Sequence, residues 1–124
     1  MKIALAQFNP TVGDFAGNSA RIIELACEAK KRGADVAVFS ELCLCGYPPQ
    51  DLVERPAFAE RNATELARLA KAIPMPSVVG YVGRAQDDTG KPVANSAALR
   101  LSVSSSSSER FNLSLSMQFK CSLY

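Results

Sequence analysis

Residues 39–52 of the chain read Phe-Ser-Glu-Leu-Cys-Leu-Cys-Gly-Tyr-Pro-Pro-Gln-Asp-Leu, and the rest of the chain is organised around them. The first residue of this stretch, Phe39, is the last of an apolar run at 34–39, and this run predicts a strand buried on both faces. The chain then reaches the carboxylate Glu41 and a Gly-Tyr-Pro-Pro turn at 46–49, which cannot continue a central strand. Open α/β sheets bind ligands at the carboxyl ends of their strands, so this position places Glu41 in a candidate site.

The segment before this stretch predicts a strand, a helix and the strand that ends near Glu41. The apolar run at 3–8 predicts a first strand in the sheet interior, and Asp14 or Asn18 can cap the helix that follows. Four apolar residues at helical spacing predict the buried face of this helix: Ile22, Leu25, Ala26 and Ala29. Gly33 ends it, and the short links predict a parallel βαβ unit.

The segment after it predicts a second helix and two further strands. Residues 51–54 form one helical turn, and Pro56 opens the second helix. Its expected buried stripe consists of Ala59, Ala63, Leu66, Ala70 and Ile73, with Leu69 beside it. Strands follow at 77–83 and 92–99, the second as a hairpin partner of the first, with a turn at 87–90. The order βαβαββ predicts an α/β layered fold.

Composition limits the classes of function that the chain can have. It has 124 residues, enough for one small domain, and a net charge of +2 from 14 basic and 12 acidic residues. Without a basic stripe, nucleic-acid binding has no electrostatic support. No apolar run has the length of a membrane span, and the N-terminal apolar stretch is too short for a signal peptide. We therefore expect a cytoplasmic protein with no nucleic-acid or membrane partner.

The chain contains no histidine, which excludes Ser-His-Asp and Cys-His mechanisms and histidine-containing zinc sites within it. Cys43 and Cys45 lack the two-residue spacer of zinc-binding pairs, so we expect small buried side chains there and no metal site. Catalysis in this chain must use carboxylates, lysines, cysteines or hydroxyls.

The composition changes abruptly at residue 102. Residues 102–124 contain nine serines and no Gly, Ala, Pro or Asp, and 104–108 is a run of serines. We therefore divide the chain into a domain at 1–101 and a divergent serine-rich tail at 102–124. A slip of the reading frame near codon 100 is our hypothesis for the change, and translation of the other two frames of the parent DNA tests it.

Within 1–101 the chain resembles the nitrilase-like carbon–nitrogen hydrolases, and within them the N-terminal glutaminase domain of bacterial glutamine-dependent NAD synthetases. The matching segments are 3–7, 9–14, 33–35, 40–42, 46–49, 51–52 and 95–97. The Gly-Tyr-Pro-Pro at 46–49 with Asp51-Leu52 indicates the synthetases rather than nitrilase relatives at large. The resemblance implies the N-terminal part of an αββα sandwich, which is incomplete in this chain.

The resemblance also implies a Glu-Lys-Cys triad that hydrolyses glutamine and supplies ammonia for ATP-dependent amidation of deamido-NAD. Glu41 matches the general base of that triad, and Tyr47 matches a residue that lines the substrate pocket. The family's lysine and nucleophilic cysteine have no counterpart here, because Lys120 and Cys121 stand in the wrong context. The resemblance implies ATP and magnesium for a synthetase domain outside the chain, and no cofactor for the chain itself. A homo-oligomer is implied for the parent protein.

Two other interpretations remain open. The chain can derive from another carbon–nitrogen hydrolase, such as an ω-amidase, or it can be a non-catalytic remnant. In either case we expect the chain alone to be inactive, because without a nucleophile Glu41 has no proton donor to act on. With strands missing from the sandwich, we also expect an open sheet face and marginal stability.

Overall fold

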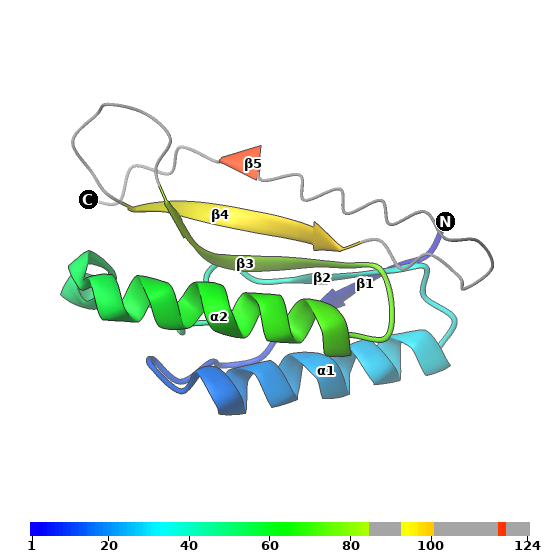
Figure 1. Cartoon of the computed structure of the whole chain (residues 1–124). Helices are drawn as coiled ribbons and strands as arrows, with labels where there is room; N and C mark the ends of the chain where they lie inside the picture. The colour runs from blue at the N-terminus through cyan, green and yellow to red at the C-terminus, as the bar shows by residue number, and fades with distance from the viewer. Residues whose placement is uncertain (85–92, 101–116, 119–124) are drawn as a thin grey trace.

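The computed structural model describes residues 1–84, 93–100 and 117–118 of the chain (Figure 1). Its elements follow the order β1 (Ile3–Ala6), α1 (Phe15–Lys31), β2 (Val36–Phe39), η1 (Gln50–Glu54), α2 (Pro56–Ala72), β3 (Ser77–Arg84), β4 (Val93–Arg100) and β5 (Met117–Gln118). The expected order βαβαββ is therefore confirmed, and the described β5 adds a short strand after it.

The strands form one mixed sheet in the order β1-β2-β3-β4-β5. β1, β2 and β3 run parallel, with Ala4 paired to Ala37 and Val38 to Val78. β4 returns antiparallel to β3 along the full length of both strands, so the expected hairpin pairing is confirmed. Both helices lie on one face of the sheet (Figure 1). This arrangement follows from two successive right-handed crossovers that step in the same direction across the sheet.

Local signals in the sequence set the ends of both helices. Asp14 is the N-cap of α1, because its Oδ1 accepts a hydrogen bond of 3.0 Å from the Gly17 backbone N–H. Gly33 follows α1 with a φ of +77°, a conformation that favours glycine. Pro56 occupies the first turn of α2, where a missing N–H costs nothing. The expected helical turn at 51–54 is observed as η1.

The hydrophobic core lies between the sheet and the two helices. α1 contributes Ile22, Ala26 and Ala29 from the predicted stripe, all buried, while Leu25 is partly buried. The rings of Phe15 and Phe58 pack with their centroids 5.1 Å apart, which joins the first turn of α1 to α2. The predicted apolar stripe therefore forms the buried face of α1, and the Phe15–Phe58 contact adds to it.

The buried stripe predicted for α2 is wrong in part. Ala63 is exposed, whereas Asn62 and Glu65 are buried with Leu69. The Asn62 Nδ2 donates a hydrogen bond of 2.7 Å to the Val82 carbonyl, which turns this polar side chain toward β3. An apolar periodicity cannot detect a buried asparagine whose amide has a backbone partner.

Two predictions about the strands need correction. Among the described residues β1 is an edge strand, not an interior one, because β2 is its only neighbour in the sheet. β2 is buried on one face only: Ala37 and Phe39 face the helices and are buried, whereas Val36 and Val38 are partly exposed. On the same open face Ile3 and Leu5 are exposed, as the incomplete sandwich predicts.

Several predictions concern residues outside the described part. They are the turn at 87–90, Lys120, Cys121 and, apart from 117–118, the serine-rich tail at 102–124. Among the described residues, no helix has both the length and the apolar character needed to cross a membrane.

Candidate active site

Glu41 lies just past the carboxyl end of β2, where the sequence predicts a site. β2 ends at Phe39, and Ser40 and Glu41 are exposed while the turn that follows is buried at Leu42, Cys43, Leu44 and Cys45. Leu42 adopts a φ of 49°, which turns the chain sharply away from the strand direction. The buried turn therefore anchors an exposed carboxylate at the sheet edge.

β3 supports this turn from beneath. It extends past the end of β2, and the Gly80 carbonyl accepts a backbone hydrogen bond of 3.4 Å from Leu44. The same carbonyl accepts a hydrogen bond from the Cys43 thiol, with 3.6 Å between the sulfur and the oxygen. The position of Glu41 is thus set by a neighbouring strand as well as by its own.

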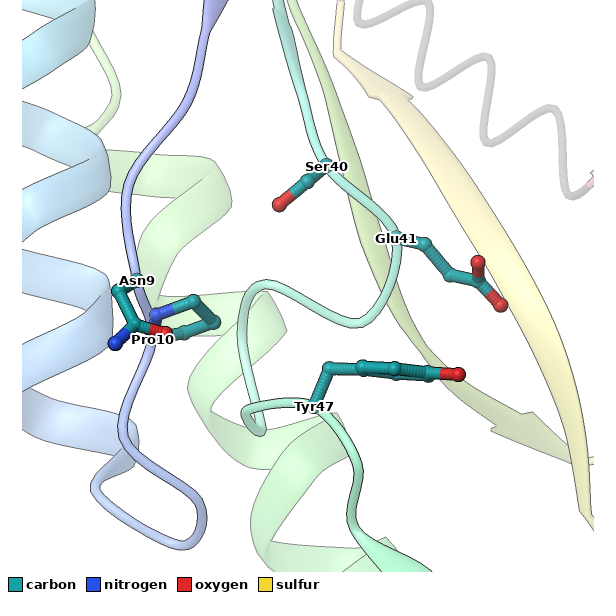
Figure 2. A pocket seen from close by; sticks show the side chains of 5 residues that line it. All are labelled: Asn9, Pro10, Ser40, Glu41 and Tyr47. Atoms are coloured by element: carbon teal, nitrogen blue, oxygen red, sulfur yellow. The ribbon is translucent and has the colours of Figure 1, made fainter.

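A pocket of about 260 Å³ opens beside Glu41, and its described lining consists of Asn9, Pro10, Ser40, Glu41 and Tyr47. Figure 2 shows two walls: Asn9 and Pro10 on the loop after β1, and the other three residues on the segment after β2. The Ser40 side chain points toward the first wall. The Glu41 carboxylate and the Tyr47 ring both extend away from it, one above the other (Figure 2). The structure therefore brings the two sequence-predicted site residues together.

Tyr47 lines this pocket and is also open to solvent. It is 49% exposed, which is high for an aromatic side chain in a small domain. The adjoining Gly46 has a φ of +90° and is buried. An exposed ring on a buried, conformationally restricted backbone is well placed to contact a ligand.

Sequence reasoning did not single out Asn9, Pro10 and Ser40 as site residues. A signal for them exists: Asn9-Pro10 follows the first strand as Ser40-Glu41 follows the second. Because β1 and β2 are parallel neighbours, their carboxyl ends lie at the same sheet edge. The two segments that follow these strands therefore had to meet, and topology alone could have identified the wall formed by Asn9 and Pro10.

Cys43 and Cys45 are fully buried and agree with the expectation of small buried side chains. Burial raises the pKa of the Cys43 thiol to about 12 and that of Cys45 to about 11. Both thiols therefore stay protonated near neutral pH and are poor nucleophiles. Within the described part, no three His, Cys, Asp or Glu side chains gather as metal ligands would.

The fold and the pocket define a class of protein. The chain belongs to the carbon–nitrogen hydrolase family, whose family model matches residues 2–101. The α/β arrangement of the described residues is the N-terminal part of the nitrilase-like fold, as the sequence predicts.

Individual relatives of the chain within this family are glutamine-dependent NAD(+) synthetases. The chain is 45% identical over 103 residues to the glutamine-dependent NAD(+) synthetase of Synechocystis sp., and 46% identical over 71 residues to that of Thermotoga maritima. These matches cover 78% and 57% of the chain but only 18% and 12% of the relatives. The chain thus spans less than a fifth of the length of these curated relatives.

Solved structures agree with this placement. The Acinetobacter baumannii glutamine-dependent NAD+ synthetase, solved in complex with ADP, superposes with a TM-score of 0.70 at 37% identity, over 80% of this chain and 18% of its own. An amidase from Nesterenkonia sp. superposes with a TM-score of 0.66 at 25% identity, over 80% of this chain and 37% of its own.

Proposed function

We propose that the chain supplies the N-terminal part of the glutaminase domain of a glutamine-dependent NAD synthetase, with Glu41 as the general base. The observation that supports this proposal most directly is the position of Glu41, exposed at the end of β2 and lining a pocket with Tyr47. The identity of 45% to a named synthetase supports the choice of glutamine as the amide substrate.

In the proposed reaction the Glu41 carboxylate accepts the thiol proton of a cysteine supplied by the rest of the longer protein. The thiolate attacks the side-chain amide carbon of glutamine, and a lysine from the same source stabilises the oxyanion. The Glu41 carboxyl then protonates the departing ammonia. Water then attacks the thioester while Glu41 accepts its proton, glutamate leaves, and Glu41 returns that proton to the released cysteine thiolate. Each half of the reaction therefore returns Glu41 to its starting charge.

Tyr47 serves substrate binding in this proposal. Its half-exposed ring lies beside Glu41 on the same wall of the pocket (Figure 2). An aromatic face of this kind packs against the two methylene groups of a glutamine side chain. The amide would then extend toward the carboxylate, which places the reacting carbon near the base.

The described lining of this pocket contains a single carboxylate and no basic side chain, which supports placing the ATP and magnesium sites elsewhere. We assign both cofactors to a synthetase domain in the remainder of the longer protein. A cytoplasmic location and a homo-oligomeric parent belong to the same proposal. So does the frame-slip origin of residues 102–124, which the parent DNA tests.

The second candidate function is that of a simple amidase, which the superposition on the Nesterenkonia amidase favours. The two candidates differ in what the same gene encodes further on. An ATP-binding synthetase segment in any frame downstream supports the first candidate, and its absence supports the second. A third possibility is that the chain as it stands is a non-catalytic remnant. Ammonia release from glutamine that is lost in the Glu41→Gln variant contradicts the remnant hypothesis.

Ligand binding tests the proposed site without requiring turnover. L-glutamine added to the ¹⁵N-labelled chain is expected to shift the amide signals of Asn9, Ser40 and Tyr47. L-glutamate is the matched control, because its second carboxylate meets the like charge of Glu41 and should bind more weakly. Glutamine shifts that are confined to residues outside the pocket, or equal responses to both ligands, contradict the proposal.

A further inference from the structure

Asn18 lies inside α1, four residues after the N-cap, yet its side chain is 3% exposed and is directed away from solvent. Its amide makes three hydrogen bonds. Oδ1 accepts from the Thr11 backbone N–H at 2.9 Å, and Nδ2 donates to the carbonyls of Thr11 at 2.8 Å and Leu44 at 3.1 Å. One side chain therefore bonds two loops that are 33 residues apart in sequence, by numbering from Thr11 to Leu44.

These two loops carry the two walls of the pocket. Thr11 directly follows Pro10 in the first wall, and Leu44 lies between Glu41 and Tyr47 in the second. The loops also touch without Asn18: the Gly13 N–H donates to the Cys45 carbonyl at 2.9 Å. A Cβ atom at Gly46 would lie 2.5 Å from the Cα of Val12, so the backbones are in direct contact.

We infer that Asn18 is a positioning residue that fixes the separation of the two pocket walls and thereby the size of the amide substrate admitted. The inference rests on the proposed function for its substrate, and on hydrogen-bond geometry for the clamp itself. The asparagine amide suits this place because it offers one acceptor and two donors in a plane. Alanine lacks all three groups, and aspartate keeps the acceptor but lacks both donors.

The test uses the full 124-residue chain and amide hydrogen exchange. In Asn18→Ala the Thr11 amide loses its acceptor directly, so its faster exchange shows only that the bond is gone. The informative amide is that of Gly13, whose partner is Cys45 and not Asn18. We expect its exchange to accelerate by about tenfold or more beyond the change in global stability, because the clamp between the loops is lost. The nuclear Overhauser contact between Val12 and Gly46 should weaken with it.

Asn18→Asp separates the two functions of the amide. Its carboxylate can still accept from the Thr11 N–H, so Thr11 should stay protected. It cannot donate to Leu44, so Gly13 exchange should rise as in the alanine variant. Asn62→Ala is the matched control, since Asn62 is also a buried helix asparagine but bonds Val82 instead. Its effect on Gly13 exchange should not exceed its effect on a core amide such as that of Ala37.

The outcomes separate this inference from the proposed function. Unchanged Gly13 exchange and an unchanged Val12–Gly46 contact in Asn18→Ala overturn the positioning role, whatever the chain binds. If L-glutamine binds, its affinity should fall in Asn18→Ala and not in Asn62→Ala, and equal losses in both variants also overturn it. If glutamine does not bind the unmodified chain, the proposed function is contradicted, and the exchange data still decide the role of Asn18.

Discussion

Gly80 of β3 lies directly against Glu41: a Cβ atom built on Gly80 would be 2.9 Å from the Cα of Glu41, and 2.7 Å from the Ser40 carbonyl oxygen. Real Cβ atoms do not approach backbone atoms this closely, so only glycine permits the observed position of the Glu41 turn. β3 thus helps to position the proposed base, because Gly80 has no side chain to push the Glu41 turn away.

The first prediction concerns Gly80→Ala. The added methyl group must displace backbone, so we expect a loss of roughly 1–3 kcal/mol in the free energy of unfolding. The amide signals of Ser40 to Leu44 should shift as well. Urea denaturation and a ¹⁵N correlation spectrum measure both effects. Gly83→Ala is the matched control on the same strand, because its new methyl group meets the Ser96 side chain instead of the Glu41 turn. Equal shifts of the turn signals in both variants contradict the prediction.

The second prediction compares two glycines that both have a positive φ. Gly13 has a φ of +79° with nothing within 4 Å of a built Cβ, and Gly46 has a φ of +90° with Val12 at 2.5 Å. Gly13→Ala should cost about 1 kcal/mol from backbone strain alone. Gly46→Ala should cost roughly 1–3 kcal/mol more, because the two loops must separate. Urea denaturation gives the difference, and indistinguishable losses would show that the contact between the loops contributes nothing.

The third prediction concerns the buried thiols. Burial raises the pKa of Cys43 to about 12 and of Cys45 to about 11, so at pH 8 neither should react with a disulfide reagent in the folded chain. Cys27 is partly exposed and should react first. A Cys121→Ser background removes the thiol that lies outside the described residues. Rapid modification of more than one thiol in the folded chain contradicts the prediction.

The same shift of the pKa predicts a dependence of stability on pH. The ordinary thiol pKa is 9.0, so above pH 9 the unfolded chain loses thiol protons that the folded chain retains. Fewer protons on the unfolded state mean that the free energy of unfolding falls with rising pH, until the folded thiols ionise near pH 11 for Cys45 and near pH 12 for Cys43. The decline should be shallower in Cys43→Ala. Parallel declines for the two chains would show that the Cys43 proton does not contribute.

The fourth prediction concerns Glu65, which is 7% exposed and has an oxygen, Oε1, without a hydrogen-bond partner. The exposed Arg68 guanidinium forms an ion pair with this oxygen at 3.6 Å, which is longer than a hydrogen bond. A buried acceptor without a donor destabilises the fold, so Glu65→Met, which keeps the side-chain length, should raise the free energy of unfolding by about 1 kcal/mol. A fall in the melting temperature would instead show that the ion pair with Arg68 stabilises the fold.

The sequence predicts most of the helices and strands, because local signals determine where they begin and end. Asp14, Gly33 and Pro56 stand where the helices begin or end, and the apolar stripe of α1 is buried at Ile22 and Ala26. The errors concern burial, which depends on the other elements that pack against a strand or helix. An apolar run such as that of β1 cannot reveal whether a second strand lies on its other side, and the exposure of Leu5 is a property of the whole sheet.

The candidate site was predictable in part. The carboxylate at the end of a buried strand and the turn at Tyr47 were visible in the sequence, but Asn18 was visible only as a candidate cap. Asparagine is common at helix caps, and no local pattern distinguishes a cap from a side chain that bonds a distant loop. The contact of Gly80 with Glu41 likewise depends on two strands packing side by side, which composition does not reveal.

The most direct test of the central claim, that Glu41 is the general base for glutamine hydrolysis, uses a chimera. Residues 1–101 replace the matching segment of the Synechocystis synthetase, to which the chain is 45% identical. NAD formation is then measured with glutamine or with ammonia as the nitrogen source. We expect Glu41→Gln to lower the glutamine-supported rate by roughly 10²–10⁴ and to leave the ammonia-supported rate unchanged. A glutamine-supported rate that survives this substitution would contradict the claim.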